Sequence, residues 1–177
     1  MADRQGELAI VHAQRASAAA DHDHRQHCAT AWHRWGLTPM RLAPNPPADK
    51  PISLSATGEV PVFAQVSTSQ RVVFITIDGG LERDPAFVAM VRDLKTPITI
   101  FLMNAIKSDY AYFKTLQALG NHIQNHTLHH PVMSHLSLAR QENVCGDQKV
   151  LTEHYGTAPL LFRPPYGVCD KDTEMPR

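Results

Sequence analysis

The sequence lacks several features that mark particular classes of protein. Its 177 residues carry no net charge, because 17 Lys and Arg balance 17 Asp and Glu, and only 7% are aromatic. No segment is rich in Lys or Arg, which argues against a dedicated nucleic-acid-binding protein. No apolar run approaches the roughly 20 residues that a membrane-spanning helix needs, so we expect no membrane span.

Signals for export and for disulfide bonding are also weak. The first residues mix acids with bases and contain no apolar block of about 7–15 residues, so we expect no secretory signal peptide. Cys28, Cys145 and Cys169 are too few and too scattered for a disulfide scaffold, although Cys145 and Cys169 could pair. Apolar residues make up 43% of the chain, which is enough for the core of one domain.

Histidine is the residue present in excess. Five of the 11 His lie within residues 12–33 and five within residues 122–135. The first group lies beside Cys28 but has no fourth metal ligand at a recognised spacing, so we expect a flexible His-rich segment there. The second group is therefore the better candidate for chemistry.

The composition divides the chain at about residue 59. Residues 1–59 are rich in Ala, His and Arg and then in Pro, which predicts a region of low order ending in a Pro-rich linker. Residues 60–177 contain the strong strand and helix patterns, and we expect them to form the folded domain.

Strand and helix patterns alternate in the folded part. The expected strands are residues 72–77, 98–103, 123–125 and 160–162, and the expected helices are residues 85–94, 108–119 and 138–155. The first strand has the continuous apolar pattern of a strand buried on both faces. This alternation predicts an α/β fold with a parallel sheet covered by helices, either open or closed into a barrel.

Reactive groups in parallel α/β folds gather at the carboxyl ends of the strands. Asp78 directly follows the first expected strand, where an Asp before two glycines is either a turn former or a functional carboxylate. Gly79 and Gly80 fit neither a Walker nor a dinucleotide-binding fingerprint, so a nucleotide site is not expected.

Two histidines follow the third expected strand. His126 and His130 are four residues apart, and on a helical turn this spacing places both rings on one face, where they could share a metal ion such as Zn²⁺. The alternative is a polar loop that happens to contain histidines. We expect His129 and His135 to be bystanders.

An arginine follows the fourth expected strand. Arg163 is held by the two prolines after it, which suits its guanidinium to bind a carboxylate through paired hydrogen bonds. The alternative is a strand that simply ends at these prolines. All three features lie at expected carboxyl ends of strands, where a parallel fold would bring them together.

The three features, taken in order, resemble a known family. The segments TIDGG at 76–80, HTLHHP at 126–131 and FRPPYG at 162–167 are similar to the first three motifs of the polysaccharide deacetylases, also called the NodB homology domain or carbohydrate esterase family 4. The resemblance covers roughly residues 60 to 177. Residues 1–59 contribute nothing to it.

The resemblance implies a (β/α) barrel that removes acetyl groups from an N-acetylated glycan polymer, either chitin-like or peptidoglycan. It implies one divalent metal, commonly zinc, with His126 and His130 as ligands. Asp78 would be the general base, Arg163 would orient it, and the backbone N–H of Tyr166 would stabilise the oxyanion. The family works mostly outside the cytoplasm or at the cell envelope.

Two departures from the family pattern predict impaired activity. Gly79 stands where the family has a second Asp, the third metal ligand, so we expect any ion to be held weakly. The chain also ends ten residues after Gly167, whereas a full barrel generally needs about 200 residues or more. We therefore expect a partial barrel of about four βα units without the family's acid histidine. The alternative functions are a catalytically inactive glycan-binding relative and a truncated gene product.

Overall fold

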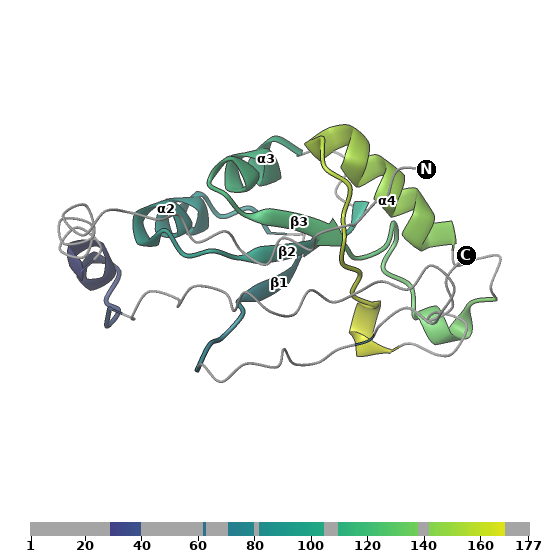
Figure 1. The fold of residues 1–177 in the computed structure, drawn as a ribbon, viewed down its shortest axis with the longest axis horizontal. Helices are drawn as coiled ribbons and strands as arrows, with labels where there is room; N and C mark the ends of the chain where they lie inside the picture. The colour runs from purple at the N-terminus through teal and green to yellow at the C-terminus, as the bar shows by residue number, and fades with distance from the viewer. Residues whose placement is uncertain are drawn as a thin grey trace, which may run out of the picture.

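A computed structural model describes residues 29–39, 62, 71–79, 82–104, 110–137 and 142–168 (Figure 1). Its centre is a parallel sheet of three strands in the order β1 (Thr76–Gly79), β2 (Thr99–Leu102) and β3 (His122–Asn125). The three strands are in register, so their carboxyl ends lie along one edge of the sheet. The predicted α/β class with parallel strands is confirmed.

Three helices pack against one face of this sheet. They are α2 (Pro85–Leu94), α3 (Tyr110–Ala118) and α4 (Glu142–Tyr155), and Figure 1 shows α3 and α4 along the upper side of the sheet. The core between helices and sheet consists of ten buried residues: Val88, Val91, Ile98, Ile100, Leu102, Phe113, Leu116, Ile123, Leu151 and Tyr155. Two short 3-10 segments, η2 (Met133–His135) and η4 (Pro165–Gly167), complete the elements.

Local sequence signals account for the ends of the helices. Asp84 caps α2 by accepting a hydrogen bond from the backbone N–H of Ala86 at 2.8 Å, and Pro85 occupies the first helical position, as predicted. Gly120 follows α3 with a φ of 92°, a left-handed conformation that glycine adopts without strain. The expected start of α4 at residue 138 lies outside the described residues.

The prediction of a doubly buried strand over residues 72–77 is wrong. The strand begins at Thr76 and includes both Asp78 and Gly79, whereas the side chain of Val73 is 88% exposed. In the part of the chain that is described, β1 pairs only with β2, so the apolar run before it is not enclosed by a second neighbour.

The expected fourth strand is reduced to one parallel bridge between Asn125 and Phe162. The reason is a side chain: Gln124 Oε1 accepts the backbone N–H groups of Leu160 and Leu161 at 2.8 and 2.7 Å. These donors are therefore not available to the backbone of β3. The segment still runs beside β3, because the N–H of Arg163 donates to the carbonyl oxygen of Asn125 at 3.0 Å.

Part of the N-terminal region is helical and contacts the domain. Residues 29–34 form a helix, and the Trp35 indole and the Arg34 guanidinium donate to one carboxylate oxygen of Asp93 at 3.1 and 3.3 Å. The sequence had led us to expect low order throughout residues 1–59, but residues 1–28 and 40–61 lie outside the described part of the chain. The division at residue 59 stays a prediction.

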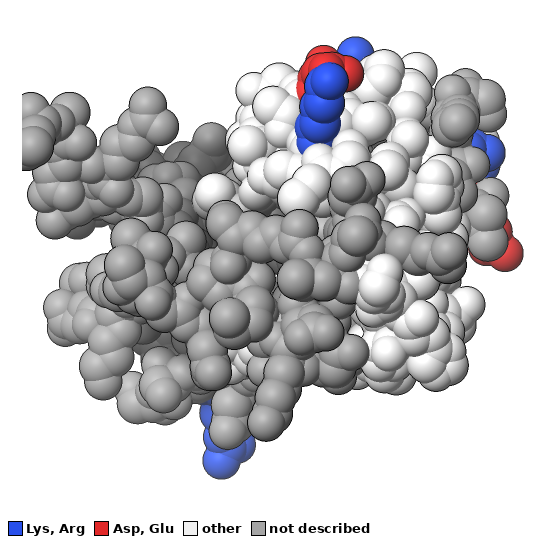
Figure 2. All heavy atoms as spheres, turned by 90° about the vertical axis from the view of Figure 1, so that its right-hand side faces the viewer, with Lys and Arg blue, Asp and Glu red and all other residues white. Residues whose placement is uncertain are grey.

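Charged side chains of the described residues are few on the face that Figure 2 shows. Basic and acidic side chains lie side by side at the top of that view, and the others are scattered at its right-hand edge and at the bottom. Cys145 is exposed on α4, whereas Cys169, with which it could pair, and the N-terminal Cys28 lie outside the described residues. Within the ranges that are described, no helix is long and apolar enough to cross a membrane.

Candidate active site

The face of the sheet opposite the helices carries Asp78, the first residue of the candidate site. Asp78 of β1, Phe101 of β2 and Gln124 of β3 are paired neighbours in the parallel register, so their side chains form one row across this face. This row alternates with the buried core residues Ile100 and Leu102 of β2. The sheet therefore has the apolar core on one face and, on the other face, Asp78 and Gln124 with Phe101 between them.

Arg163 lies over this row and holds Asp78. Its Nη1 donates to Asp78 Oδ1 at 2.6 Å, and its Nη2 donates to Thr76 Oγ1 at 3.0 Å. The guanidinium carbon lies 4.0 Å from the centre of the Phe101 ring, a cation–π contact. Three contacts thus fix the guanidinium that the sequence predicted would bind a carboxylate.

His126 is the first residue after β3, and it is buried beside Arg163. Its Nδ1 lies 2.8 Å from the carbonyl oxygen of Arg163, and because a carbonyl can only accept, Nδ1 carries the proton. The lone pair is therefore on Nε2, the form that binds a metal ion. Burial lowers the pKa of the His126 imidazole, while the hydrogen bond to Arg163 opposes this shift. Burial therefore favours the neutral ring.

A strained loop brings His126 and His130 together. The ring centroids of the two histidines are 4.9 Å apart, but they do not lie on the helical turn that we expected. Thr127 and His130 have positive φ angles of 74° and 54°, which a helix does not allow. Side chains hold the loop: Asn125 Oδ1 accepts the N–H of Thr127 and Thr127 Oγ1 accepts the N–H of His130, each at 3.0 Å.

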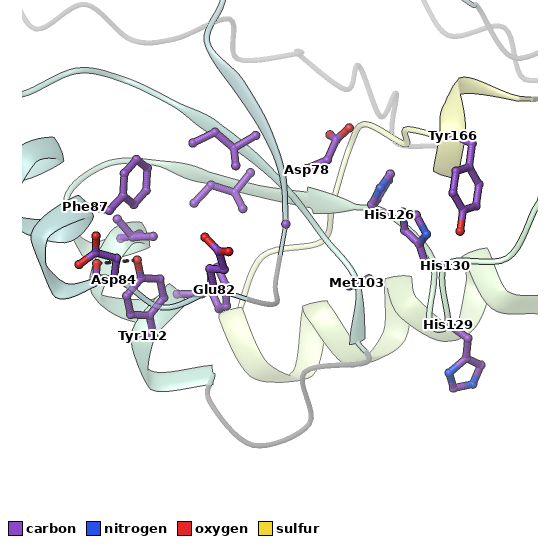
Figure 3. Close-up of a pocket in the computed structure, with 15 residues that line it drawn as sticks. Asp78, Glu82, Asp84, Phe87, Met103, Tyr112, His126, His129, His130 and Tyr166 are labelled. Atoms are coloured by element: carbon purple, nitrogen blue, oxygen red, sulfur yellow. Dashed lines mark hydrogen bonds between the residues drawn. The ribbon is translucent and has the colours of Figure 1, made fainter.

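Tyr166 closes the other side of the histidine pair. Its ring centroid is 4.7 Å from that of His130, and its side chain is 67% exposed. Tyr166 also has a positive φ of 60°. In Figure 3 the Tyr166 ring lies beside His130, whereas the ring of His129 points away from the pair.

These side chains border one groove of about 990 Å³. Asp78, Gly79, His126, His130 and Tyr166 all line it, so residues from three distant motifs reach the same space. Met103 also lines the groove, and Glu82, Asp84 and Tyr112 extend the lining away from the histidines (Figure 3). The sequence analysis had not singled out these four residues for the site.

Asp147 was also missed, because its position inside α4 carries no motif. It is fully buried, and its Oδ2 accepts the backbone N–H of His126 at 3.2 Å. Burial raises the pKa of the Asp147 carboxyl to about 7, although hydrogen bonding by the backbone N–H groups of His126 and Asn104 counteracts this shift.

The residues present supply two ligands for a divalent ion. Across the described ranges, no three His, Cys, Asp or Glu side chains lie close enough together to form a metal site. The Asp78 carboxylate already accepts a hydrogen bond from Arg163. Gly79 has no side chain, although there is room for one: a Cβ at this position would meet nothing closer than Ile77 Cγ2 at 3.7 Å. The donor set therefore fits an ion held by two imidazoles and completed by water, one protein ligand short of the usual catalytic zinc site.

Comparisons with known proteins agree with the three motifs. The chain is 41% identical over 115 residues to an uncharacterized protein of Streptomyces coelicolor, covering 64% of this chain and 46% of that protein. It is 32% identical over 108 residues to a peptidoglycan-N-acetylglucosamine deacetylase of Bacillus cereus, covering 58% of this chain and 50% of that protein. The chain therefore spans about half the length of these relatives.

The fold and a match to a family model support the same family. A crystal structure of a CE4 family pseudoenzyme from Bacillus anthracis superposes with a TM-score of 0.56 at 18% identity, covering 60% of this chain and 39% of that one, which shows the shared fold. The family described as polysaccharide deacetylase matches residues 65–175. The chain belongs to the polysaccharide deacetylase family, also named carbohydrate esterase family 4, and covers part of its domain.

Proposed function

We propose that this chain catalyses, with impaired activity, the metal-dependent hydrolysis of the N-acetyl groups of an N-acetylated polysaccharide. The observation that supports this best is the meeting of Asp78 and the histidine pair in one groove, with Arg163 bound to Asp78 although the two are 85 residues apart. These residues come from the segments that resemble the first three family motifs, and the matching family is described as polysaccharide deacetylase.

The side chains divide the proposed reaction between them. Asp78 takes a proton from the attacking water, and Arg163 orients its carboxylate through the 2.6 Å contact. The backbone N–H of Tyr166 donates to the oxyanion that forms when water adds to the acetamide carbonyl. The C–N bond then breaks, and the amine leaves with the proton that Asp78 took from the water. Burial of His126 keeps its ring neutral and therefore able to act as a ligand.

His126 and His130 would hold the divalent ion, with Zn²⁺ the first candidate. When bound, the ion supplies a Lewis acid that polarises the acetamide carbonyl. With only two protein ligands, we expect its affinity to be low. The weak ion site is the physical reason why we propose impaired activity.

The relatives suggest the substrate class and the place of action. Since a relative of Bacillus cereus is named a peptidoglycan-N-acetylglucosamine deacetylase, we propose a peptidoglycan or chitin-like polymer as the partner of the groove. Such a polymer places the chain at the cell envelope or outside the cell. We further propose that residues 60–177 form part of the deacetylase domain and that residues 1–59 lie outside it.

A second candidate function is binding of glycan without hydrolysis. Gly79 favours it, because the position next to Asp78 offers no metal ligand. The groove and its aromatic lining, which includes Tyr112 and Tyr166, would remain available to a sugar polymer.

Acetate release from an N-acetylated chitin oligosaccharide and from peptidoglycan, with zinc present, separates the two candidates. We expect slow release by the wild-type chain that is abolished by Asp78→Asn and by His126→Ala. His135→Ala is the matched control, because this exposed histidine lies on η2 and should leave the rate unchanged. No acetate from the wild-type chain, together with measurable binding of the oligosaccharide, would replace the hydrolase proposal by the binding proposal.

A further inference from the structure

Asp147 is a buried acid for which the proposed reaction has no use. It lies within α4, its side chain is 0% exposed, and its Oδ1 has no hydrogen-bond partner among the described residues. Burying a carboxyl group that is only partly hydrogen-bonded costs free energy. One turn further along the same helix, Leu151 is 1% exposed and apolar, the ordinary choice for such a position. An acid at this place therefore needs a reason.

One hydrogen bond of the Asp147 carboxyl leads directly to the histidine pair. Its Oδ2 accepts the backbone N–H of His126 at 3.2 Å, and the same N–H lies 3.3 Å from the carbonyl oxygen of Leu102. His126 is the residue at which the chain leaves β3 and enters the strained loop. The carboxyl therefore fixes the backbone at the point from which the His126 ring projects.

The ring of His126 is held at its other end by Arg163. Nδ1 donates to the Arg163 carbonyl at 2.8 Å, and this bond fixes the tautomer with the lone pair on Nε2. A hydrogen bond to the backbone and a hydrogen bond to the ring thus define one orientation. If the backbone of His126 shifts, the Nδ1 bond to Arg163 lengthens and the tautomer is no longer selected.

We propose that Asp147 is a positioning residue for His126: its carboxyl holds the His126 backbone so that the imidazole presents Nε2 as a metal ligand. This role rests on the proposed function, because His126 needs a fixed tautomer only if it binds a metal ion. The acceptor oxygen matters rather than the charge, so Asn should replace Asp147 and an apolar side chain should not.

The test compares Asp147→Asn with Asp147→Leu in the full 177-residue chain. Long-range proton–nitrogen NMR spectra report the tautomer of His126, and calorimetry reports zinc affinity. We expect Asp147→Asn to keep the wild-type ring signals and affinity. In Asp147→Leu the His126 signals should move toward a mixture of tautomers, and zinc affinity should fall about tenfold, as for loss of an outer-shell partner. Unchanged ring signals in Asp147→Leu would overturn the inference.

A second pair of variants separates positioning from general loss of stability. Asp147→Ala and Leu151→Ala each remove a buried side chain from the same face of α4. The His126 ring signals should move in Asp147→Ala alone, and movement in both variants or in neither would contradict the role. The ring signals are read without zinc or glycan, so they decide this inference even if the acetate assay overturns the proposed hydrolysis.

Discussion

At the scale of single residues, Arg163 joins the two halves of the candidate site. Its side chain binds Asp78 and its backbone carbonyl binds the His126 ring, so one residue sets the position of the proposed base and of a proposed ligand. The Asp78 and Arg163 side chains are 46% and 33% exposed, and solvent screening makes such a pair worth about 1 kcal/mol or less. The pair therefore orients groups more than it stabilises the fold.

Asp147 predicts a pH dependence of stability. Because its pKa is raised from 3.8 to about 7 in the folded chain, the native state keeps a proton that the unfolded state has lost between these values. The free energy of unfolding should therefore fall as the pH rises from about 4 to 7, by up to roughly 4 kcal/mol from this group.

Urea unfolding between pH 4.5 and 7.5 measures this dependence. Asp147→Asn does not titrate, so its stability should change less over this range than that of the wild-type chain. Asp84→Asn serves as the control, because Asp84 is exposed and its substitution should leave the slope unchanged. Parallel curves for the wild-type chain and Asp147→Asn would show that the buried carboxyl does not hold its proton to neutral pH.

At the scale of elements, the start of α2 gives a local prediction. Asp84 accepts the N–H of Ala86 at 2.8 Å, so Asp84→Ala should lower the free energy of unfolding by about 1 kcal/mol. Asp84→Asn keeps an acceptor oxygen and should lie close to the wild-type value in the same urea experiment. Equal stability of the Ala and wild-type chains would mean that the cap contributes nothing.

The elements show what local sequence can and cannot predict. The cap at Asp84 and the glycine at position 120 are local signals, and the helices they delimit are confirmed. The run at 72–77 and the run at 160–162 are equally apolar, but their state depends on neighbours distant in sequence. The Gln124 side chain, which takes the backbone donors of the second run, cannot be anticipated from that run alone.

In the molecule as a whole, the sequence motifs predicted which residues meet at the site. The register of the parallel strands explains why they meet. Order along the chain predicted that Asp78, the histidine pair and Arg163 would share one edge of a sheet. The structure brings Asp78 and the two histidines to one groove, and Arg163 contacts both Asp78 and His126. The supporting Phe101 was missed, because its role follows from its pairing with Asp78 in the sheet. The roles of all these residues in catalysis stay a proposal.

We propose that His126, His130 and position 79 converge on one ion, and a calorimetric zinc titration of Gly79→Asp tests this convergence. Gly79→Ala is the matched control, since it fills the same space without adding a ligand. We expect Gly79→Asp to bind one zinc at least about tenfold more tightly than the wild-type chain, because a third ligand completes the site. Adding His126→Ala to Gly79→Asp should cancel this gain in zinc affinity. A zinc affinity that does not rise in Gly79→Asp, or a gain that survives the loss of His126, would show that position 79 and the histidines do not share one ion.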